Sequence, residues 1–299
     1  MKVLIIGATG NLGRLTAHAL TQQHPTIQLR LTSRSSEGRD ALHEAFPTAQ
    51  ISAADWSNEA ALREAINGVD KILMVTPDFT TDERVATTNL ARAVKDDGGI
   101  SQVLRFIAIP PGFTVANLTA EQLATRCGAA LHVIAKPLLD ASGLPVTYVN
   151  AACWIMFNLP WFMAEDVKAT RRLVMPSSAD AARQWVSEND IADVFAKILS
   201  DDPSRHIGQD YLVTGGPRYT FAQVAALLGE VLGEKVTYVD DDSALRRTMG
   251  ANFPTLMTYF SHETQAYSAV PSTQTLEQLL GRPRVSLREY LEQNEATFR

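Results

Sequence analysis

A group of glycines near the start of the chain is the first feature with a chemical use. The apolar segment Val3–Ile6 is followed by Gly7, Gly10 and Gly13, and a helical pattern begins within the same segment. Gly7 permits a tight turn off a strand, Gly10 lets backbone N–H groups approach a phosphate, and Gly13 allows close packing of the helix. Because a helix N-terminus is positive and its first N–H groups are unpaired, this arrangement predicts a dinucleotide pyrophosphate site. The residues expected to contact the ligand are Gly7, Thr9, Gly10, Asn11, Leu12 and Gly13.

The residue types after the second predicted strand indicate which dinucleotide binds. An NAD site usually carries Asp or Glu about 20 residues beyond the glycines, where it binds the ribose 2′-hydroxyl. Here Gln28–Thr32 leads into Ser33, Arg34 and Ser35, with no acidic residue before Glu37. A guanidinium matches the geometry of a phosphate, and a serine can add a hydrogen bond. We therefore expect NADP(H) rather than NAD(H), with Arg34 and Ser35 at the 2′-phosphate. The alternative is that Arg34 is a surface charge after a strand.

Apolar strands alternating with helical patterns must position these groups. The expected strands are Val3–Ile6, Gln28–Thr32, Gln50–Ser52, Lys71–Val75, Val103–Ile107, Val146–Val149 and Tyr211–Thr214. The expected helices between them include Asn11–Gln22, Asn58–Ile66, Asp82–Lys95 and Leu131–Ala141. This alternation predicts an α/β fold with a doubly wound, mostly parallel sheet.

After about residue 216 the pattern becomes mostly helical. We expect a dinucleotide-binding domain over residues 1–150, completed by about 187–216. Residues 151–186 and 217–299 would form a smaller, mostly helical subdomain on the substrate side. Helix starts are expected at three pairs with the spacing of a capping box: Ser187 and Asp190, Thr220 and Gln223, Ser286 and Glu289.

Composition excludes several classes of protein. The 299 residues are 45% hydrophobic and carry a formal net charge of −6 without a basic run, so we expect no nucleic-acid partner. The longest apolar stretch, 151–163, is broken by Asn158 and Pro160 and is too short to span a membrane. The N-terminus fits a core strand rather than a signal peptide, which favours the cytoplasm. Two cysteines and no zinc-like His/Cys spacing predict neither a disulfide framework nor a metal site.

The amino-acid sequences of the glycine turn and of later segments resemble those of a known family. The spacing G-x-x-G-x-x-G, Val75-Thr76-Pro77 after the fourth strand and Asp190-Ile191-Ala192-Asp193 are similar to the atypical, NmrA-like branch of the short-chain dehydrogenases. The resemblance covers roughly residues 1–240 and implies a Rossmann fold that binds a nicotinamide dinucleotide. In this superfamily an Asp after the third strand often meets the adenine, which implies that role for Asp55. Asp55 could equally cap the helix that follows it. Val75, Thr76 and Pro77 would lie at the carboxyl edge of the sheet, where ligands gather.

The catalytic residues of related dehydrogenases are replaced here. Those enzymes use a Ser at the end of strand five, and a Tyr with a Lys four residues later on the next helix. In this chain the fifth strand and its end, 104–111, contain no Ser, and the next helix offers His132 and Lys136. Both side chains lie on one helix face, and His can donate a proton near neutral pH. We expect Lys136 or His132 to contact the ribose or donate the proton. The alternative is a partly buried helix residue, His132, and a surface charge, Lys136.

An aromatic segment after the sixth strand is implied to line the substrate pocket in this family. It contributes Trp154, Phe157, Asn158 and Trp161, which suggest an apolar or aromatic small-molecule ligand. The alternatives are ordinary core or the face of a homodimer. The predicted function is an NADPH-dependent oxidoreductase that transfers hydride to a small acceptor such as a quinone, enone or imine. The alternative is an NmrA-like redox sensor that binds NADP(H) without turnover.

Overall fold

A computed structural model describes residues 1–176 and 181–299, and the side chains of all of these except 261–265. Residues 177–180, within the predicted substrate-side segment 151–186, lie outside the described residues. The chain forms two compact units. Unit 1 consists of Met1–Ile109, Phe113–Asn150 and Ile191–Leu212, and unit 2 of Pro110–Gly112, Ala151–Asp190 and Val213–Arg299.

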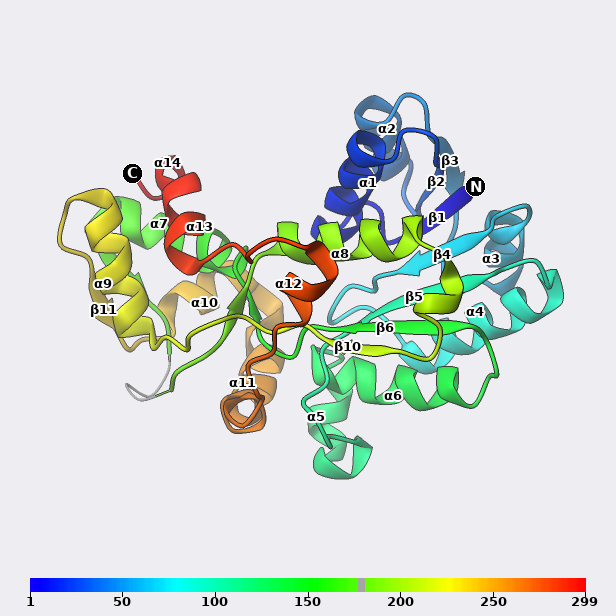
Figure 1. Cartoon of the computed structure of the whole chain (residues 1–299). Coiled ribbons are helices and arrows are strands. Elements are labelled where there is room, and N and C mark those ends of the chain that lie inside the picture. Colours follow the sequence, from blue (N-terminus) through cyan, green and yellow to red (C-terminus); the bar gives the residue numbers. More distant parts are fainter. Residues whose placement is uncertain (177–180) are drawn as a thin grey trace. The chain divides into compact units, whose positions relative to one another are not determined.

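Unit 1 is built on a seven-stranded sheet with the order β10-β6-β5-β4-β1-β2-β3 (Figure 1). Its strands are β1 (Lys2–Ile6), β2 (Gln28–Ser33), β3 (Gln50–Ala53), β4 (Lys71–Met74), β5 (Gln102–Ile107), β6 (Val146–Asn150) and β10 (Asp210–Leu212). All neighbouring strands are parallel. The strand order reverses at β1, so a crevice for a ligand is expected where the carboxyl ends of β1 and β4 meet. The doubly wound parallel sheet predicted from the sequence is confirmed.

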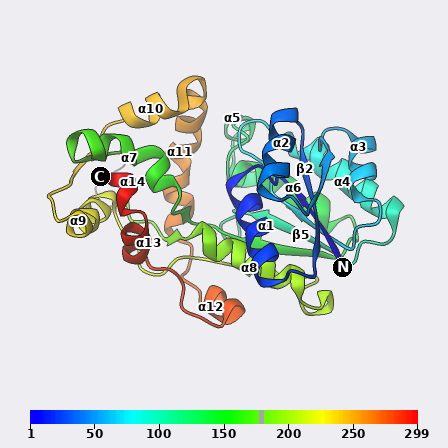
Figure 2. The same ribbon diagram turned by 90° about the horizontal axis from the view of Figure 1, so that it is seen from above.

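Helices cover both faces of this sheet. On one face α1 (Asn11–Gln23) lies beside α8 (Glu188–Ser200), as Figure 1 and Figure 2 show, and Gln23 Nε2 donates to Asp193 Oδ1 at 2.9 Å. The other face carries α3 (Glu59–Ile66), α4 (Glu83–Asp97) and α6 (Ala129–Asp140). Their apolar side chains form one core with those of β1, β4 and β5. The remaining elements are α2 (Ser36–Ala45), α5 (Ala120–Ala124) and the short 3₁₀ turns Val115–Asn117 and Pro203–Arg205.

Unit 2 is mostly helical, as predicted. It contains α7 (Asn158–Thr170), α9 (Phe221–Leu232), α10 (Ser243–Met249), α11 (Phe253–Ser268), α12 (Thr275–Leu280), α13 (Leu287–Gln293) and α14 (Glu295–Phe298). Two small parallel sheets join β7 (Trp154–Ile155) to β9 (Trp185–Val186), and β8 (Arg172–Val174) to β11 (Thr237–Val239). Capping boxes open α9 at Thr220 and α13 at Ser286, as the sequence predicted. In the described part of the chain, no helix is long and apolar enough to cross a membrane.

Within unit 2, the C-terminal segment around Arg282 and Val285 is hydrogen-bonded to Asp190 at the start of α8. Asp190 is fully buried, and its Oδ1 accepts from Arg282 Nη1 at 2.7 Å while its Oδ2 accepts from the Val285 amide at 2.8 Å. Nearby, the Tyr290 hydroxyl donates to Glu188 Oε1 at 2.9 Å. We call the contacts of Asp190 with Arg282 and Val285 the C-terminal tether. The helix begins at Glu188 rather than at the predicted Ile191, and the capping pattern of Ser187 and Asp190 did not indicate these contacts of the Asp190 carboxylate.

Candidate functional site

The glycine turn between β1 and α1 is shaped by two close backbone approaches. Gly7 has a φ of +91°, and a Cβ on it would lie 2.1 Å from the carbonyl oxygen of Val75. A Cβ on Gly13 would lie 2.3 Å from the Gly7 oxygen. Neither position accepts a larger side chain without moving the backbone. The turn is closed by a hydrogen bond of 3.0 Å from the Gly10 amide to the Gly7 oxygen.

The N-terminus of α1 is open to a ligand. Its N-cap residue is Gly10, no side chain caps the helix, and its first turn contains no acidic residue. Thr9, Gly10 and Asn11 are exposed, whereas the Leu12 side chain is buried in the core. Leu12 and Gly13 can therefore contribute only backbone groups. The positive helix end and its free amides form a chemically suitable cradle for a pyrophosphate.

Two arginines lie at the end of β2. Arg34 is exposed, and its Cζ atom lies 4.6 Å from the ring centroid of Trp56. The Nη1 of Arg39 donates to the Arg34 carbonyl oxygen at 3.0 Å, so the Arg39 guanidinium lies beside the Arg34 backbone. Ser35 is the N-cap of α2, and its hydroxyl oxygen accepts from the Gly38 amide at 3.0 Å. Its O–H remains a possible donor. This end of β2 concentrates positive charge and donors that suit a phosphate.

Asp55 has a local structural partner. Its Oδ1 accepts from the Ser57 amide at 2.8 Å and from the Ser57 hydroxyl at 2.7 Å. The helix that follows, α3, is capped by Asn58 rather than by Asp55. Asp55 therefore stabilises the turn before α3, and the alternative that it caps this helix is wrong. Its role at an adenine stays a prediction.

At the end of β4 the three predicted residues differ in exposure. Pro77 is exposed and Val75 partly buried, while Thr76 is buried. The Thr76 hydroxyl hydrogen-bonds to the Glu83 carboxylate and accepts from Arg105 Nη2 at 2.9 Å. Since its side chain is used internally, Thr76 can offer a cofactor only its backbone. Glu83 and Arg105 were missed because a charged residue within an apolar strand or helix pattern gives no signal of its partner.

His132 is buried near the start of α6. Its Nδ1 accepts from the Ala108 amide at 3.0 Å, so the proton of the neutral ring lies on Nε2. The ring meets that of Phe106 edge to face, with centroids 5.8 Å apart. Burial and, second, the charge of Arg105 hold the pKa of His132 well below its usual value. The geometry therefore favours a neutral imidazole that carries its proton on Nε2.

The lowered pKa of His132 predicts a pH-dependent contribution to stability. Below pH about 6.5 the unfolded chain binds a proton at this residue that the folded chain resists, so stability is lost as the pH falls. We expect the wild type to lose up to about 1.4 kcal/mol per pH unit more than His132→Gln below that pH. Urea unfolding at pH 7.5, 6.5 and 5.5 measures the difference. Parallel stability curves for the two proteins would contradict it.

Lys136, one turn after His132, is surrounded by partners. Its Nζ lies 3.0 Å from Asp140 Oδ2 and 3.7 Å from Asp210 Oδ2, and 4.4 Å from the ring centroid of Tyr148. The Tyr148 hydroxyl donates to Asp140 Oδ1 at 2.8 Å. Burial and the adjacent Asp140 raise the pKa of Tyr148, which keeps this hydroxyl protonated. Lys136 thus does have a tyrosine neighbour, from β6 rather than from its own helix.

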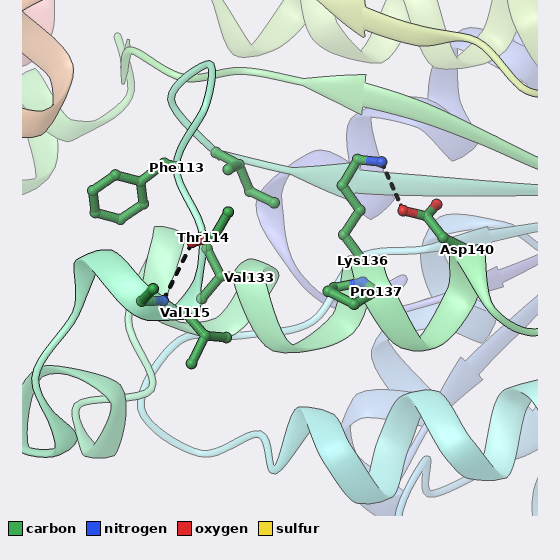
Figure 3. A pocket seen from close by; sticks show the side chains of 9 residues that line it. Phe113, Thr114, Val115, Val133, Lys136, Pro137 and Asp140 are labelled. Carbon is green, nitrogen blue, oxygen red and sulfur yellow. Dashed lines mark hydrogen bonds and ion pairs between the residues drawn. The ribbon is translucent and has the colours of Figure 1, made fainter.

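A pocket of about 340 Å³ lies between α6 and the loop after β5, within unit 1. Figure 3 shows Phe113 and Val115 at one end and the ion pair of Lys136 with Asp140 at the other. Its walls are largely apolar and include Val133 and Pro137. Lys136 lines this pocket, whereas no residue of the glycine turn does.

The predicted substrate residues lie in unit 2 and differ in burial. Trp154 is buried, and its ring packs edge to face against the rings of Trp185, Phe221 and Phe260. Trp154 thus occupies the ordinary core position named as an alternative. Trp161 on α7 is 50% exposed and stacks on Phe157.

Asn158 is the first residue of α7. Contact of Trp154, Phe157, Asn158 or Trp161 with a substrate stays a prediction. Among the described residues no group of His, Cys, Asp and Glu has the arrangement of a metal site.

Comparison with known proteins gives matches over nearly the whole chain. A model of the NmrA-like family matches residues 1–290. A phenylcoumaran benzylic ether reductase from Ginkgo biloba is 30% identical over 262 residues, which cover 85% of this chain and 83% of the relative.

Two solved structures share the fold. An NADPH-dependent quinone oxidoreductase from Escherichia coli, complexed with NADPH, has a TM-score of 0.77 at 22% identity and covers 98% of this chain and 99% of its own. NmrA, a negative transcriptional regulator in complex with NADP, has a TM-score of 0.76 at 18% identity, with 97% and 94% covered.

Proposed function

The chain belongs to the NmrA-like family, and on that premise we propose that it is an NADPH-dependent oxidoreductase which reduces a small apolar or aromatic acceptor. The observation that carries the proposal is the glycine turn, which leaves the N-terminus of α1 uncapped and its amides open. A helix end of this kind binds a pyrophosphate. The reductase relative, which is 30% identical, supports hydride transfer as the use of the bound dinucleotide.

NADP(H) is the proposed cofactor. Arg34 and Arg39 place two guanidinium groups at the end of β2, where the strand order puts the adenosine ribose. The E. coli quinone oxidoreductase and NmrA, which share this fold, were solved in complex with NADPH and NADP. When bound, the cofactor supplies the hydride. Thr9, Gly10 and Asn11 would hold its pyrophosphate, and Arg34 with Ser35 its 2′-phosphate.

Reversing the charge at Arg34 is expected to reverse cofactor preference. A charged hydrogen bond to the 2′-phosphate contributes about 2 kcal/mol, so Arg34→Asp should raise the Kd for NADPH about thirtyfold. The affinity for NADH, which lacks that phosphate, should stay the same or increase. Calorimetric titration with each nucleotide gives the ratio of the two Kd values. Arg84→Asp, the same change at an exposed residue of α4, is the control, and an unchanged ratio in Arg34→Asp would reject this assignment.

The residues proposed to lie near the nicotinamide favour acceptors whose reduction does not require a strong proton donor. His132 is held neutral with Nδ1 already accepting a hydrogen bond, and Lys136 is engaged by Asp140, Asp210 and Tyr148. Reduction of a quinone, enone or imine depends mainly on the positioning of acceptor and cofactor. The chain's contribution would then be to bind, orient and exclude water rather than to protonate a carbonyl oxygen.

Consumption of NADPH with a panel of quinones, enones and imines tests the proposal. Steady oxidation that is lost in Lys136→Ala or His132→Phe would support an enzyme and the two predicted catalytic residues. Oxidation that persists in both variants would support the enzyme but remove those residues from its chemistry. Tight NADPH binding with none of the acceptors consumed would contradict the reductase.

The second candidate function is a sensor that binds NADP(H) without turnover. The state of both side chains favours it, because a neutral His132 imidazole is a weak acid and the Lys136 ammonium is paired with Asp140. The shared fold with NmrA, a transcriptional regulator complexed with NADP, is consistent with this candidate. Fold alone does not assign function, so the NADPH oxidation experiment decides between the two.

Location and partners are proposed from the sequence. We propose a cytoplasmic location, which fits the two cysteines being free rather than paired in a disulfide. We propose small molecules rather than nucleic acids as ligands, because the chain is acidic and has no basic run. A homodimer is the further partner proposal, supported by the exposed ring of Trp161.

A further inference from the structure

A buried ion pair lies at the carboxyl ends of β4 and β5. Arg105 of β5 pairs with Glu83, the first residue of α4, and neither side chain has exposed surface. Thr76 Oγ1 donates to Glu83 Oε1 and accepts from Arg105 Nη2 at 2.9 Å. Thr87 Oγ1 donates to Glu83 Oε2 at 2.8 Å. We call these four residues the Glu83 network.

A gain in folding stability does not by itself explain why a fully buried ion pair is present here. Removing two charges from water is unfavourable, and apolar side chains of similar volume often stabilise a core equally well. A buried pair can instead specify one arrangement of the elements that it connects. The Glu83 network connects three elements: the start of α4, the strand β5 and the segment after β4.

The network holds the end of β4 through two contacts. Arg105 Nη1 donates to the carbonyl oxygen of Met74, the last residue of β4, at 3.2 Å, and Nη2 reaches Thr76. Between these two residues lies Val75, whose carbonyl oxygen is the atom that a Cβ on Gly7 would meet at 2.1 Å. The glycine turn therefore packs against the Val75 carbonyl group. Because Arg105 holds Met74 and Thr76 in place, it also holds the Val75 carbonyl between them.

Given the proposed function, on which this step rests, we propose that Arg105 and Glu83 are positioning residues for the nicotinamide half of the cofactor. In the strand order β2-β1-β4-β5, a pyrophosphate at the β1 turn leaves the adenosine half toward β2 and Arg34. The nicotinamide half then lies over β4 and β5. Because Arg105 and Glu83 are fully buried, they act through the backbone of Val75 and Thr76.

Two ligands separate this role from a general structural one. NADPH extends over both halves of the site, whereas 2′,5′-ADP carries only the adenosine half. In Arg105→Met/Glu83→Gln, which removes both charges together, we expect the Kd for NADPH to rise about tenfold and that for 2′,5′-ADP to stay within about twofold. Thr76→Val, which keeps the ion pair and the side-chain shape, should give the same pattern: a higher Kd for NADPH and a Kd for 2′,5′-ADP within about twofold of the wild type. It provides the test if the double variant fails to fold.

Thr87→Val is the matched control. It removes a hydroxyl from the same carboxylate, but this hydroxyl donates to Glu83 Oε2 within α4, whereas Thr76 and Arg105 reach the end of β4. Both Kd values should stay within about twofold of the wild type. Unchanged NADPH binding in folded Arg105→Met/Glu83→Gln and Thr76→Val, or an equal loss of 2′,5′-ADP binding, would overturn the positioning role. A wild-type chain that binds neither ligand would contradict the proposed function itself.

Discussion

Gly13→Ala is expected to weaken NADPH binding about 100-fold, which corresponds to about 3 kcal/mol of binding free energy. The added Cβ would lie 2.3 Å from the Gly7 carbonyl oxygen and 2.9 Å from its carbon. Both contacts are with backbone, which cannot rotate aside as a side chain can. The first turn of α1 would have to move away from the glycine turn, and the amides that meet the pyrophosphate would no longer converge. Calorimetric titration measures the loss.

Gly216→Ala is the control for this substitution. Its added Cβ would find nothing nearer than the Arg284 side chain at 3.9 Å, so nucleotide binding should stay within about twofold. Circular dichroism of both variants separates lost binding from lost folding. Full NADPH affinity in a folded Gly13→Ala protein would contradict the proposed cradle.

Asp190→Ala is expected to lower the free energy of unfolding by about 3 kcal/mol. The substitution leaves the Val285 amide and the Arg282 guanidinium without the carboxylate that both now contact. Asp190 itself is fully buried, while the Arg282 side chain is 41% exposed. Water can therefore solvate the remaining charge in part, which places the expected loss below that for a wholly buried pair. Chemical denaturation followed by circular dichroism measures it.

Glu230→Ala provides a matched surface substitution in unit 2. Glu230 of α9 pairs with Arg288 of α13, and both side chains are about half exposed or more. An exposed pair of this kind contributes less than about 1 kcal/mol. An equal loss of stability in the two variants would show that the burial of Asp190 is not what makes its contacts strong.

The strands were predictable because a parallel strand covered on both faces is apolar along its length. All seven predicted strands of the large sheet are present, with bounds that differ by at most a few residues. The glycine spacing likewise predicted a strand, a turn and a helix, and the structure adds the reason for two of the glycines. Gly7 and Gly13 are required by backbone contacts with Val75 and with Gly7 itself.

The partners of polar residues were less predictable, because they come from distant segments. The sequence places His132 and Lys136 one helical turn apart. It does not show that the loop after β5 supplies the Ala108 amide to one and that β10 supplies Asp210 to the other. Arg105 stands in an otherwise apolar strand, and only the folded chain brings Glu83 to it. Such pairings depend on the register of strands and helices, which a single sequence does not specify.

The C-terminal tether bears on how the chain folds during its synthesis on the ribosome. Every segment of unit 1 has been translated once Leu212 is made, whereas Asp190 meets its partners only when Arg282 and Val285 have emerged. The nucleotide-binding half is therefore expected to fold first and unit 2 to follow after release. A chain that ended before Arg282 would have an intact unit 1 but a buried Asp190 carboxylate without these partners in unit 2, and we expect proteases to degrade it.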